Sequence, residues 1–115
     1  MALNSYFIGI NKYLDSQIFD LSGASNDAKA LWALFTDTIP DIQAHLFVDE
    51  QANVESVKNV FESVLSKASV DDSVIITFAG HGTPDHRLVC YNTIKDDCPS
   101  TSISAEEIAN YFRKS

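Results

Sequence analysis

The sequence predicts an α/β fold in which helices cover the faces of a mainly parallel β-sheet. Strand-like and helix-like segments alternate along the 115 residues in the order β-α-β-α-β. The strand-like segments are short runs of apolar residues, which is typical of strands buried on both faces of a parallel sheet. The helix-like segments carry apolar residues three and four positions apart, on one helical face. Because parallel strands need crossover helices between them, this alternation favours a parallel sheet over a meander.

The first predicted unit is a strand over residues 6–10 followed by a loop and a helix. Residues 13–23 show no regular period and are expected to form the loop. Ser25-Asn26 is a helix N-cap signal, and Asp27 follows in the first turn, where the helix dipole favours an acid. Pro40 closes the unit. The apolar face of this helix consists of Ala28, Leu31, Trp32 and Phe35.

The second predicted unit begins with a strand over residues 44–48 and a polar turn over residues 49–53. The apolar face of the helix that follows consists of Val57, Val60, Phe61, Val64, Leu65 and Ala68. Asp71-Asp72 is a loop, and residues 74–79 form the clearest strand of the chain. Since this strand is apolar on both faces apart from Thr77, we expect it to lie at the centre of the sheet.

The end of the chain predicts a short strand within residues 87–92 and a last helix. Ser104 and Glu107 form a capping box, in which the two side chains bond each other's backbone N–H groups. The apolar positions of this helix are Ile108, Ala109, Tyr111 and Phe112. The alternating pattern would place another strand after Ser115. We therefore expect the chain to be the front part of a longer domain.

Composition excludes several classes of protein. Lys and Arg number 8 and Asp and Glu 16, so the net charge is −8 at pH 7. Such an acidic chain is a poor ligand for nucleic acids and anionic membranes. No apolar run is long enough to span a bilayer, and residues 1–5 show no export signal. Cys90 and Cys98 are too few for a disulfide scaffold and are expected to be free thiols in a reducing cytosol.

The strongest site candidate is His81, which follows the strand 74–79 and lies between Gly80 and Gly82. In open α/β sheets, ligands bind beyond the carboxyl ends of the strands. The flanking glycines allow a sharp turn, and the N–H of Gly82 is free to point at a substrate oxygen, as in an oxyanion hole. Two interpretations remain open: a catalytic histidine, or a histidine that only ends a strand at a tight turn.

The other candidates have simpler explanations. An acid such as Asp27 at a helix N-terminus is usually a favourable dipole contact and no more. Cys90 could be a nucleophile, but a buried structural thiol is favoured. His45 is expected at an edge or on the surface. A zinc site would combine His81, His86, Cys90 and Cys98, but their spacing matches no compact ligand pair. The chain contains no dinucleotide fingerprint, P-loop or nucleophile elbow.

The segment from Val74 to Gly82 resembles the histidine strand of caspase-like cysteine peptidases, most closely the bacterial caspase-like proteins and metacaspases. Four further segments resemble other parts of this family in the same order: residues 6–13, 21–28, 47–52 and 83–89. The resemblance covers most of residues 5–112. It implies a caspase-like three-layer sandwich and a cysteine endopeptidase that uses a Cys–His dyad.

The resemblance also implies roles for individual residues. His81 matches the catalytic histidine, and the N–H of Gly82 would contribute to the oxyanion hole. Asp27 matches an aspartate that lines the metacaspase S1 pocket, where an acid favours Lys or Arg at P1. True caspases place an arginine in this region to bind aspartate, but this chain has none before Arg87. Ala24 stands where many metacaspases have a cysteine.

The nucleophile is not expected within this chain. In caspases the cysteine follows a strand roughly 50 residues after the histidine, which here lies past Ser115. Neither Cys90 nor Cys98 follows a buried strand at that distance from His81. We therefore expect residues 1–115 to be the N-terminal, large-subunit-like part of one caspase-like domain, truncated before the cysteine strand and inactive alone.

The resemblance leaves three functional hypotheses. In the first, a second chain or a missing C-terminal part carries the cysteine, and the cytoplasmic protease cleaves proteins or peptides without a cofactor or metal. In the second, the chain is an inactive caspase-like interaction module that pairs with an active homologue or partner chain through an exposed sheet edge. In the third, which only fold-level analogy supports, the chain is a doubly wound signalling or small-ligand domain with no proteolytic link.

Overall fold

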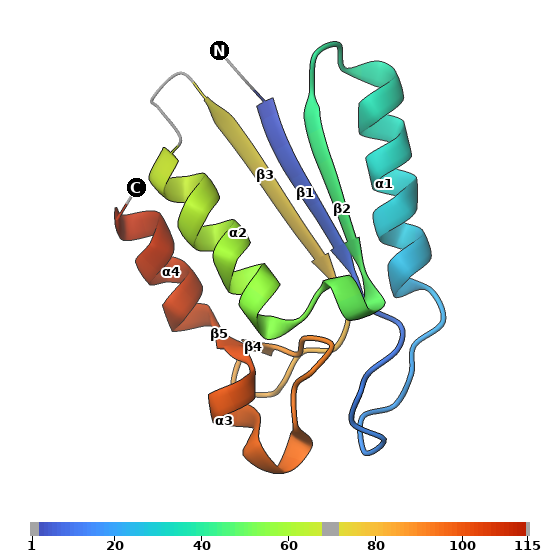
Figure 1. The fold of residues 1–115 in the computed structure, drawn as a ribbon, viewed down its shortest axis with the longest axis vertical. Coiled ribbons are helices and arrows are strands. Elements are labelled where there is room, and N and C mark those ends of the chain that lie inside the picture. Colours follow the sequence, from blue (N-terminus) through green and yellow to red (C-terminus); the bar gives the residue numbers. More distant parts are fainter. Residues whose placement is uncertain (1–2, 68–71, 115) are drawn as a thin grey trace.

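A computed structural model of the protein describes residues 3–67 and 72–114. Three parallel strands form one sheet in the order β2-β1-β3 (Figure 1). The strands are β1 (Leu3–Gly9), β2 (Gln43–Val48) and β3 (Ser73–Ala79). They are connected through α1 (Ala24–Thr38) and α2 (Val54–Lys67). The predicted parallel α/β fold is confirmed, while Ala68 and Asp71 of the predicted second helix and loop lie outside the described residues.

The strand β3 lies at an edge of the sheet in the described part of the chain, so its predicted central position is wrong. The central strand is β1, which pairs with β2 along one side and with β3 along the other. The side chains of Phe7 and Ile8 on β1 are buried, whereas those of residues 74–79 on β3 are only half-buried. An apolar run predicts burial on both faces of a strand, but it contains no information about pairing along both edges.

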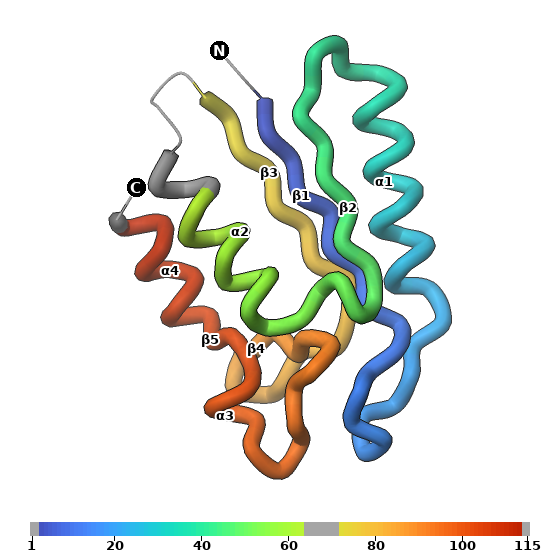
Figure 2. Tube along the Cα trace, viewed as in Figure 1, coloured from blue at the N-terminus to red at the C-terminus, as the bar shows by residue number. Residues whose placement is uncertain are grey.

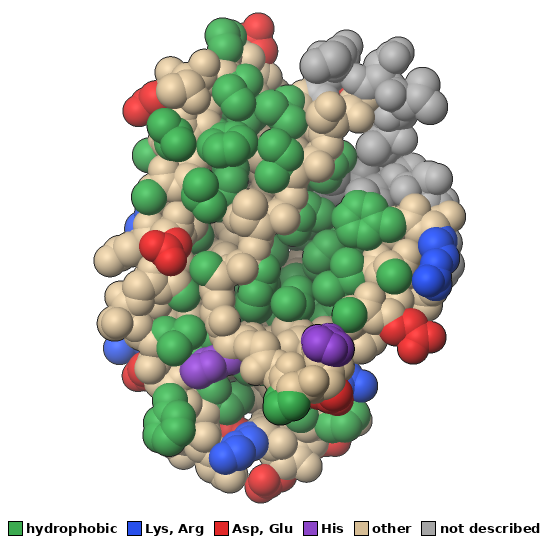
Figure 3. Space-filling model, turned by 180° about the vertical axis from the view of Figure 1, so that it is seen from behind, with side chains coloured by type: hydrophobic (Ala, Val, Ile, Leu, Met, Phe, Trp, Pro, Cys, Tyr) green, Lys and Arg blue, Asp and Glu red, His purple; other side chains and the backbone are tan. Residues whose placement is uncertain are grey.

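Helices cover both faces of the sheet. Consecutive residues of a strand point to opposite faces, and Phe7 packs against Phe35 of α1 with ring centroids 5.3 Å apart. Its neighbour Ile8 belongs to the core cluster that α2 builds with Val57 and Phe61. A last helix, α4 (Ala105–Lys114), packs on α2. The fold is therefore a three-layer sandwich with α1 on one side and α2 and α4 on the other. Figure 3 shows that apolar side chains remain visible over the α1 side.

The end of the chain builds a small second unit. β4 (Arg87–Leu88) pairs antiparallel with β5 (Ile103–Ser104), and a one-turn helix, α3 (Cys98–Thr101), precedes β5. The predicted capping box at the start of α4 is confirmed. The Ser104 N–H donates to Glu107 Oε1 at 3.3 Å, and the Glu107 N–H donates to Ser104 Oγ at 3.1 Å.

The start of α1 differs from the prediction, because its N-cap residue is Gly23 and Ser25 lies within the helix. The side chain of Asn11, from the loop after β1, supplies the cap instead. Its Oδ1 accepts from the Ser25 N–H at 3.1 Å, and its Nδ2 donates to Ser25 Oγ at 2.6 Å. Cap residues normally come from the adjoining sequence, so a cap from a distant segment leaves no local signal.

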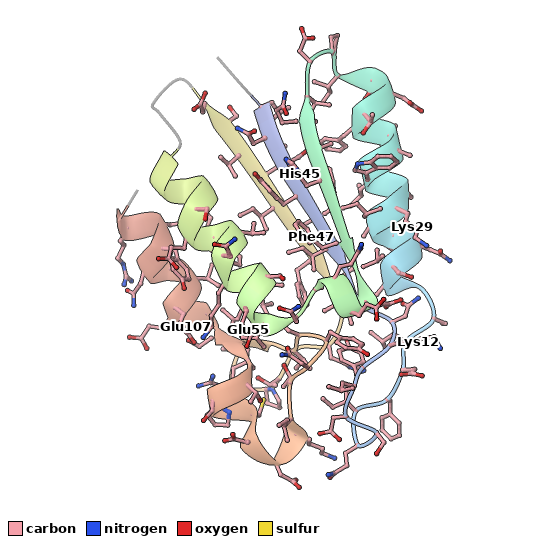
Figure 4. All side chains as sticks on the ribbon, viewed as in Figure 1. Lys12, Lys29, His45, Phe47, Glu55 and Glu107 are labelled. Atoms are coloured by element: carbon pink, nitrogen blue, oxygen red, sulfur yellow. The ribbon has the colours of Figure 1, made fainter. Side chains whose placement is uncertain are left out.

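The carboxyl ends of the three strands point to one end of the molecule, where the loops that follow β1 and β3 gather (Figure 2). Figure 4 shows His45 and Phe47 on the opposite edge strand, β2. His45 is exposed and stacks on Tyr6 with ring centroids 4.7 Å apart, which confirms its expected surface position. Among the described helices, none combines the length and apolar character that crossing a membrane requires.

Candidate functional site

The hairpin after β3 holds His81 at the carboxyl end of the sheet. The N–H of Val89 donates to the carbonyl of His81 at 3.1 Å, and the N–H of Thr83 donates to the carbonyl of Arg87 at 3.2 Å. These two bonds form an antiparallel bridge between Gly82 and Leu88. The histidine is therefore fixed by its backbone on both sides, as a side chain that must act at one position requires.

The imidazole of His81 is oriented by a backbone carbonyl. Its Nε2 lies 2.7 Å from the carbonyl oxygen of Phe19, in the loop after β1. Because a carbonyl oxygen can only accept a hydrogen bond, Nε2 must carry the hydrogen. The other ring nitrogen, Nδ1, then holds the lone pair of the neutral ring. The arrangement leaves one defined nitrogen of His81 available as a base.

Tyr13 connects the ends of β1 and β3 beneath His81, a role that the sequence did not predict. Its hydroxyl accepts from the backbone N–H of His81 at 3.0 Å and donates to the carbonyl of Ile10 at 3.2 Å. The two rings lie against each other with centroids 5.1 Å apart. Tyr13 is only 8% exposed, and burial raises the pKa of its phenol, so the hydroxyl keeps its proton and both bonds.

We expect Tyr13→Phe to destabilise the chain by about 2 kcal/mol, because the part-buried His81 N–H and the buried Ile10 carbonyl would both lose their partner. Urea unfolding measures this difference in the free energy of unfolding. The matched control is Tyr6→Phe, a half-buried tyrosine of β1, whose effect should stay within about 0.5 kcal/mol. Equal unfolding midpoints for the two variants would contradict the role assigned to Tyr13.

The two glycines beside His81 differ in how much space a side chain would have at their positions. A Cβ atom on Gly80 would lie 3.0 Å from the hydroxyl of Tyr13, so a side chain would disturb that contact. On Gly82 a Cβ would meet only the carbonyl of Arg87 at an ordinary 3.6 Å. None of the described glycines has a positive φ, and the left-handed residue of this hairpin is His86, with φ 62°. The sharp turn therefore does not depend on the glycines.

The N–H of Gly82 points away from Leu88, because the bridge between the two residues uses the backbone groups of their neighbours. Gly82 is exposed, and within the described part of the chain its N–H has no acceptor. This N–H, adjacent to His81, can therefore donate to the oxygen of a bound molecule.

Asp27 lies at the same end of the sheet as His81 but in a different hollow. It is exposed in the first turn of α1. The hollow beside it has a volume of about 460 Å³ and is lined by the first turns of α1 and by residues 77–79 of β3. His81 instead lines a hollow of about 370 Å³ together with Gly82 and Phe19. The structure thus places Asp27 and His81 near the end of β3 without joining them in one cavity.

The two cysteines have different environments. Cys90 is 0% exposed in the core, and burial raises the pKa of its thiol to about 12. It is therefore protonated and unreactive near neutral pH, which confirms the predicted buried thiol. Cys98 is partly exposed and lines the same hollow as His81. Residues 3–67 and 72–114 contain no group of three His, Cys, Asp or Glu side chains that could hold a metal ion.

Comparison with known proteins gives one result that bears on this site. The family model of the caspase domain, a peptidase family, matches residues 2–115. A search of curated proteins finds no match. The family match includes the strand that ends before His81 and the loops that contact its ring. Since it extends over nearly the whole chain, this chain belongs to the caspase family of cysteine peptidases.

Proposed function

We propose that this chain supplies the histidine base and part of the oxyanion hole of a cysteine endopeptidase. The observation that carries this proposal is the fixed imidazole of His81, whose Nε2 donates to the carbonyl of Phe19. We call the chain together with the polypeptide that carries the cysteine the assembled protease. We infer that it is of the bacterial caspase-like or metacaspase type and works in the cytosol on protein or peptide substrates.

The proposed mechanism uses both ring nitrogens of His81. Nδ1 takes the proton of the cysteine thiol, and the thiolate attacks the carbonyl carbon of the scissile bond. The N–H of Gly82 donates to the oxyanion that forms. The imidazolium, stabilised through Nε2 by the carbonyl of Phe19, then gives its proton to the leaving amine as the peptide bond breaks. Water hydrolyses the remaining thioester and regenerates the thiol.

We propose that the nucleophile comes from outside residues 1–115, which form the large-subunit-like part of the domain. Cys90 is excluded by its burial and raised pKa. One edge of β3 has no partner strand in the described residues, which leaves space for a strand from a second chain or a continuation of this one. The coding sequence after Ser115 should reveal an apolar strand and a cysteine roughly 50 residues after His81. A stop codon there would direct the search to a second gene.

The activity is tested on the assembled protease with fluorogenic peptides that end in Arg, Lys or Asp. We expect cleavage after Arg and Lys and inhibition by iodoacetamide, because the nucleophile is a thiolate. The 115-residue chain alone should cleave none of them. Cleavage by the chain alone would contradict the proposal and would point to Cys98, since Cys90 is inaccessible.

For Asp27 we propose a role in binding Lys or Arg at P1, supported by its exposed position beside the hollow at residues 77–79. Asp27→Ala should lower kcat/KM for these substrates by roughly 10- to 100-fold, because a charge-assisted hydrogen bond is lost. The matched control is Asp37→Ala, an exposed acid near the other end of α1, which should change nothing. An unchanged P1 preference in Asp27→Ala would remove Asp27 from the pocket.

A second candidate function is favoured by the same free edge of β3. The chain could be an inactive module that adds its edge to the sheet of an active homologue. The two functions differ in the expected partner: a polypeptide with a catalytic cysteine, or a complete protease. Co-purification from the source cells followed by mass spectrometry distinguishes them.

A further inference from the structure

The hollow beside His81 differs in character from the hollow beside Asp27. It has a volume of about 370 Å³ and collects side chains from the loop after β1 and from the part of the chain that runs from the end of β3 through β4 to the start of α3. Its apolar lining consists of Ile18, Phe19, Val89 and Pro99. Phe19 is 83% exposed at its rim, which is unusual for so large an apolar side chain. This volume falls within the range of small-molecule sites, about 300–1,000 Å³.

Two of the polar groups in this hollow, the guanidinium of Arg87 and the hydroxyl of Thr93, are already engaged by other protein groups. The guanidinium of Arg87 pairs with Asp85 at 3.1 Å and donates to the carbonyl of Pro99 at 3.2 Å. The hydroxyl of Thr93 accepts from the Cys90 N–H and donates to the carbonyl of Thr101. A ligand therefore finds mainly apolar surface here and does not have to compensate a buried charge.

The position of His81 relates the two hollows to the two halves of a peptide substrate. The Asp27 hollow is lined by residues 77–79, before His81, and the second hollow by residues 81–83, and the two share no residue. In the proposed function, which this step assumes, the residue before the scissile bond lies at Asp27. His81 must contact the leaving amine to give it a proton, so the polypeptide after the scissile bond continues past His81.

We propose that the hollow formed by Phe19, Val89 and Pro99 beside His81 is the subsite for the substrate residue that follows the scissile bond, and that it selects an apolar side chain. Burying such a side chain against this lining stabilises the complex on the leaving-group side. Specificity would then come from two sides of His81: a basic residue before the cleaved bond and an apolar residue after it.

Cys98 provides a reporter for binding that does not require peptidase activity. It lines the hollow and is partly exposed, whereas Cys90 is buried with a raised pKa. Of the two cysteines in this chain, iodoacetamide at mildly alkaline pH should therefore alkylate Cys98 and not Cys90, and mass spectrometry of the chain verifies that Cys90 stays unmodified. The probes are Leu-Gly-Gly-amide and Gly-Gly-Gly-amide, whose free amino groups correspond to the leaving amine.

We expect the leucine peptide to slow alkylation of Cys98 saturably and to bind roughly tenfold or more tightly than the glycine peptide. Phe19→Ala should weaken this binding severalfold while keeping the carbonyl that orients His81. The matched control is Leu14→Ala, which removes a side chain that is 68% exposed in the same loop but does not line the hollow. Equal protection by the two peptides, or equal effects of the two variants, would overturn the inference.

Cleavage assays on the assembled protease separate this inference from the proposed function. Substrates with Leu or Phe after the scissile bond should be cleaved faster than those with Gly, and Phe19→Ala should reduce this difference. Cleavage rates that do not depend on the residue after the scissile bond would contradict the proposed subsite but not the proposed function. Protection of Cys98 by the leucine peptide without any cleavage would count against the proposed function, while binding by the hollow would stand.

Discussion

Replacing His81 by alanine is expected to abolish peptide cleavage by the assembled protease while this chain keeps its fold. General acid–base catalysis contributes roughly 10²- to 10⁴-fold, and His81 is proposed to perform both proton transfers. The backbone bonds of His81 to Tyr13 and Val89 do not involve its ring and remain in the variant. The measurement is kcat/KM with an arginine peptide, together with circular dichroism of the variant.

The matched control is His45→Ala, which removes an exposed imidazole from β2, the far edge strand of the sheet. This variant should keep the activity of the unmodified protein. Full activity in His81→Ala would eliminate the proposed dyad, whatever the role of the hollows beside it. Loss of activity in both variants would mean that the assay reports stability and not chemistry, which the circular dichroism spectra would show.

Among the Gly→Ala substitutions that this chain allows, Gly9→Ala is expected to cause the largest loss of stability. A Cβ atom at Gly9 would lie 2.7 Å from the Cβ of Ala28 and 2.9 Å from the Cα of Ser25, and closer still to the carbonyl oxygen of Ala24. These are largely backbone atoms of α1, so the helix as a whole would have to move away from β1. We expect a loss of about 3 kcal/mol in the free energy of unfolding.

Urea unfolding measures this loss, and the melting temperature should fall by about 10 °C. The matched control is Gly23→Ala, because no atom lies within 4 Å of the Cβ that it adds. Gly23→Ala should change the free energy of unfolding by no more than about 1 kcal/mol. Alanine is a weaker N-cap residue, which destabilises the helix, but it also makes the unfolded chain less flexible, which partly offsets that loss. A similar loss in both variants would indicate that the close approach of α1 to β1 is not what requires glycine.

Most elements of the fold could be predicted because they repeat a local pattern. The period of apolar residues indicates α2, and the capping box at Ser104 and Glu107 indicates the start of α4. The short α3 and β5 carry no such pattern, because four and two residues are too few to show a period. The edge position of β3 also left no signal, since pairing is decided by distant strands.

The candidate site was predictable only in part for the same reason. His81 was identified because it follows an apolar strand between glycines, a pattern contained in nine consecutive residues. Tyr13 and the carbonyl of Phe19 reach His81 from another loop, more than sixty residues earlier in the chain. Such contacts depend on how the loops meet in the folded chain. Every residue type has a backbone carbonyl, so the sequence cannot indicate which carbonyl will contact the histidine.

The central position of β1 also affects how the chain folds as it is synthesised. Tyr6 pairs with His45 of β2 and Ile76 of β3, so both neighbours of β1 are made after it. β1 leaves the ribosome before both of them, and its buried side chains Phe7 and Ile8 stay exposed to water until α1 and α2, which cover them, have emerged. Because every strand pair in this sheet closes a long loop, the sheet assembles late and slowly. The nascent chain is therefore expected to depend on chaperones that shield apolar strands during this interval.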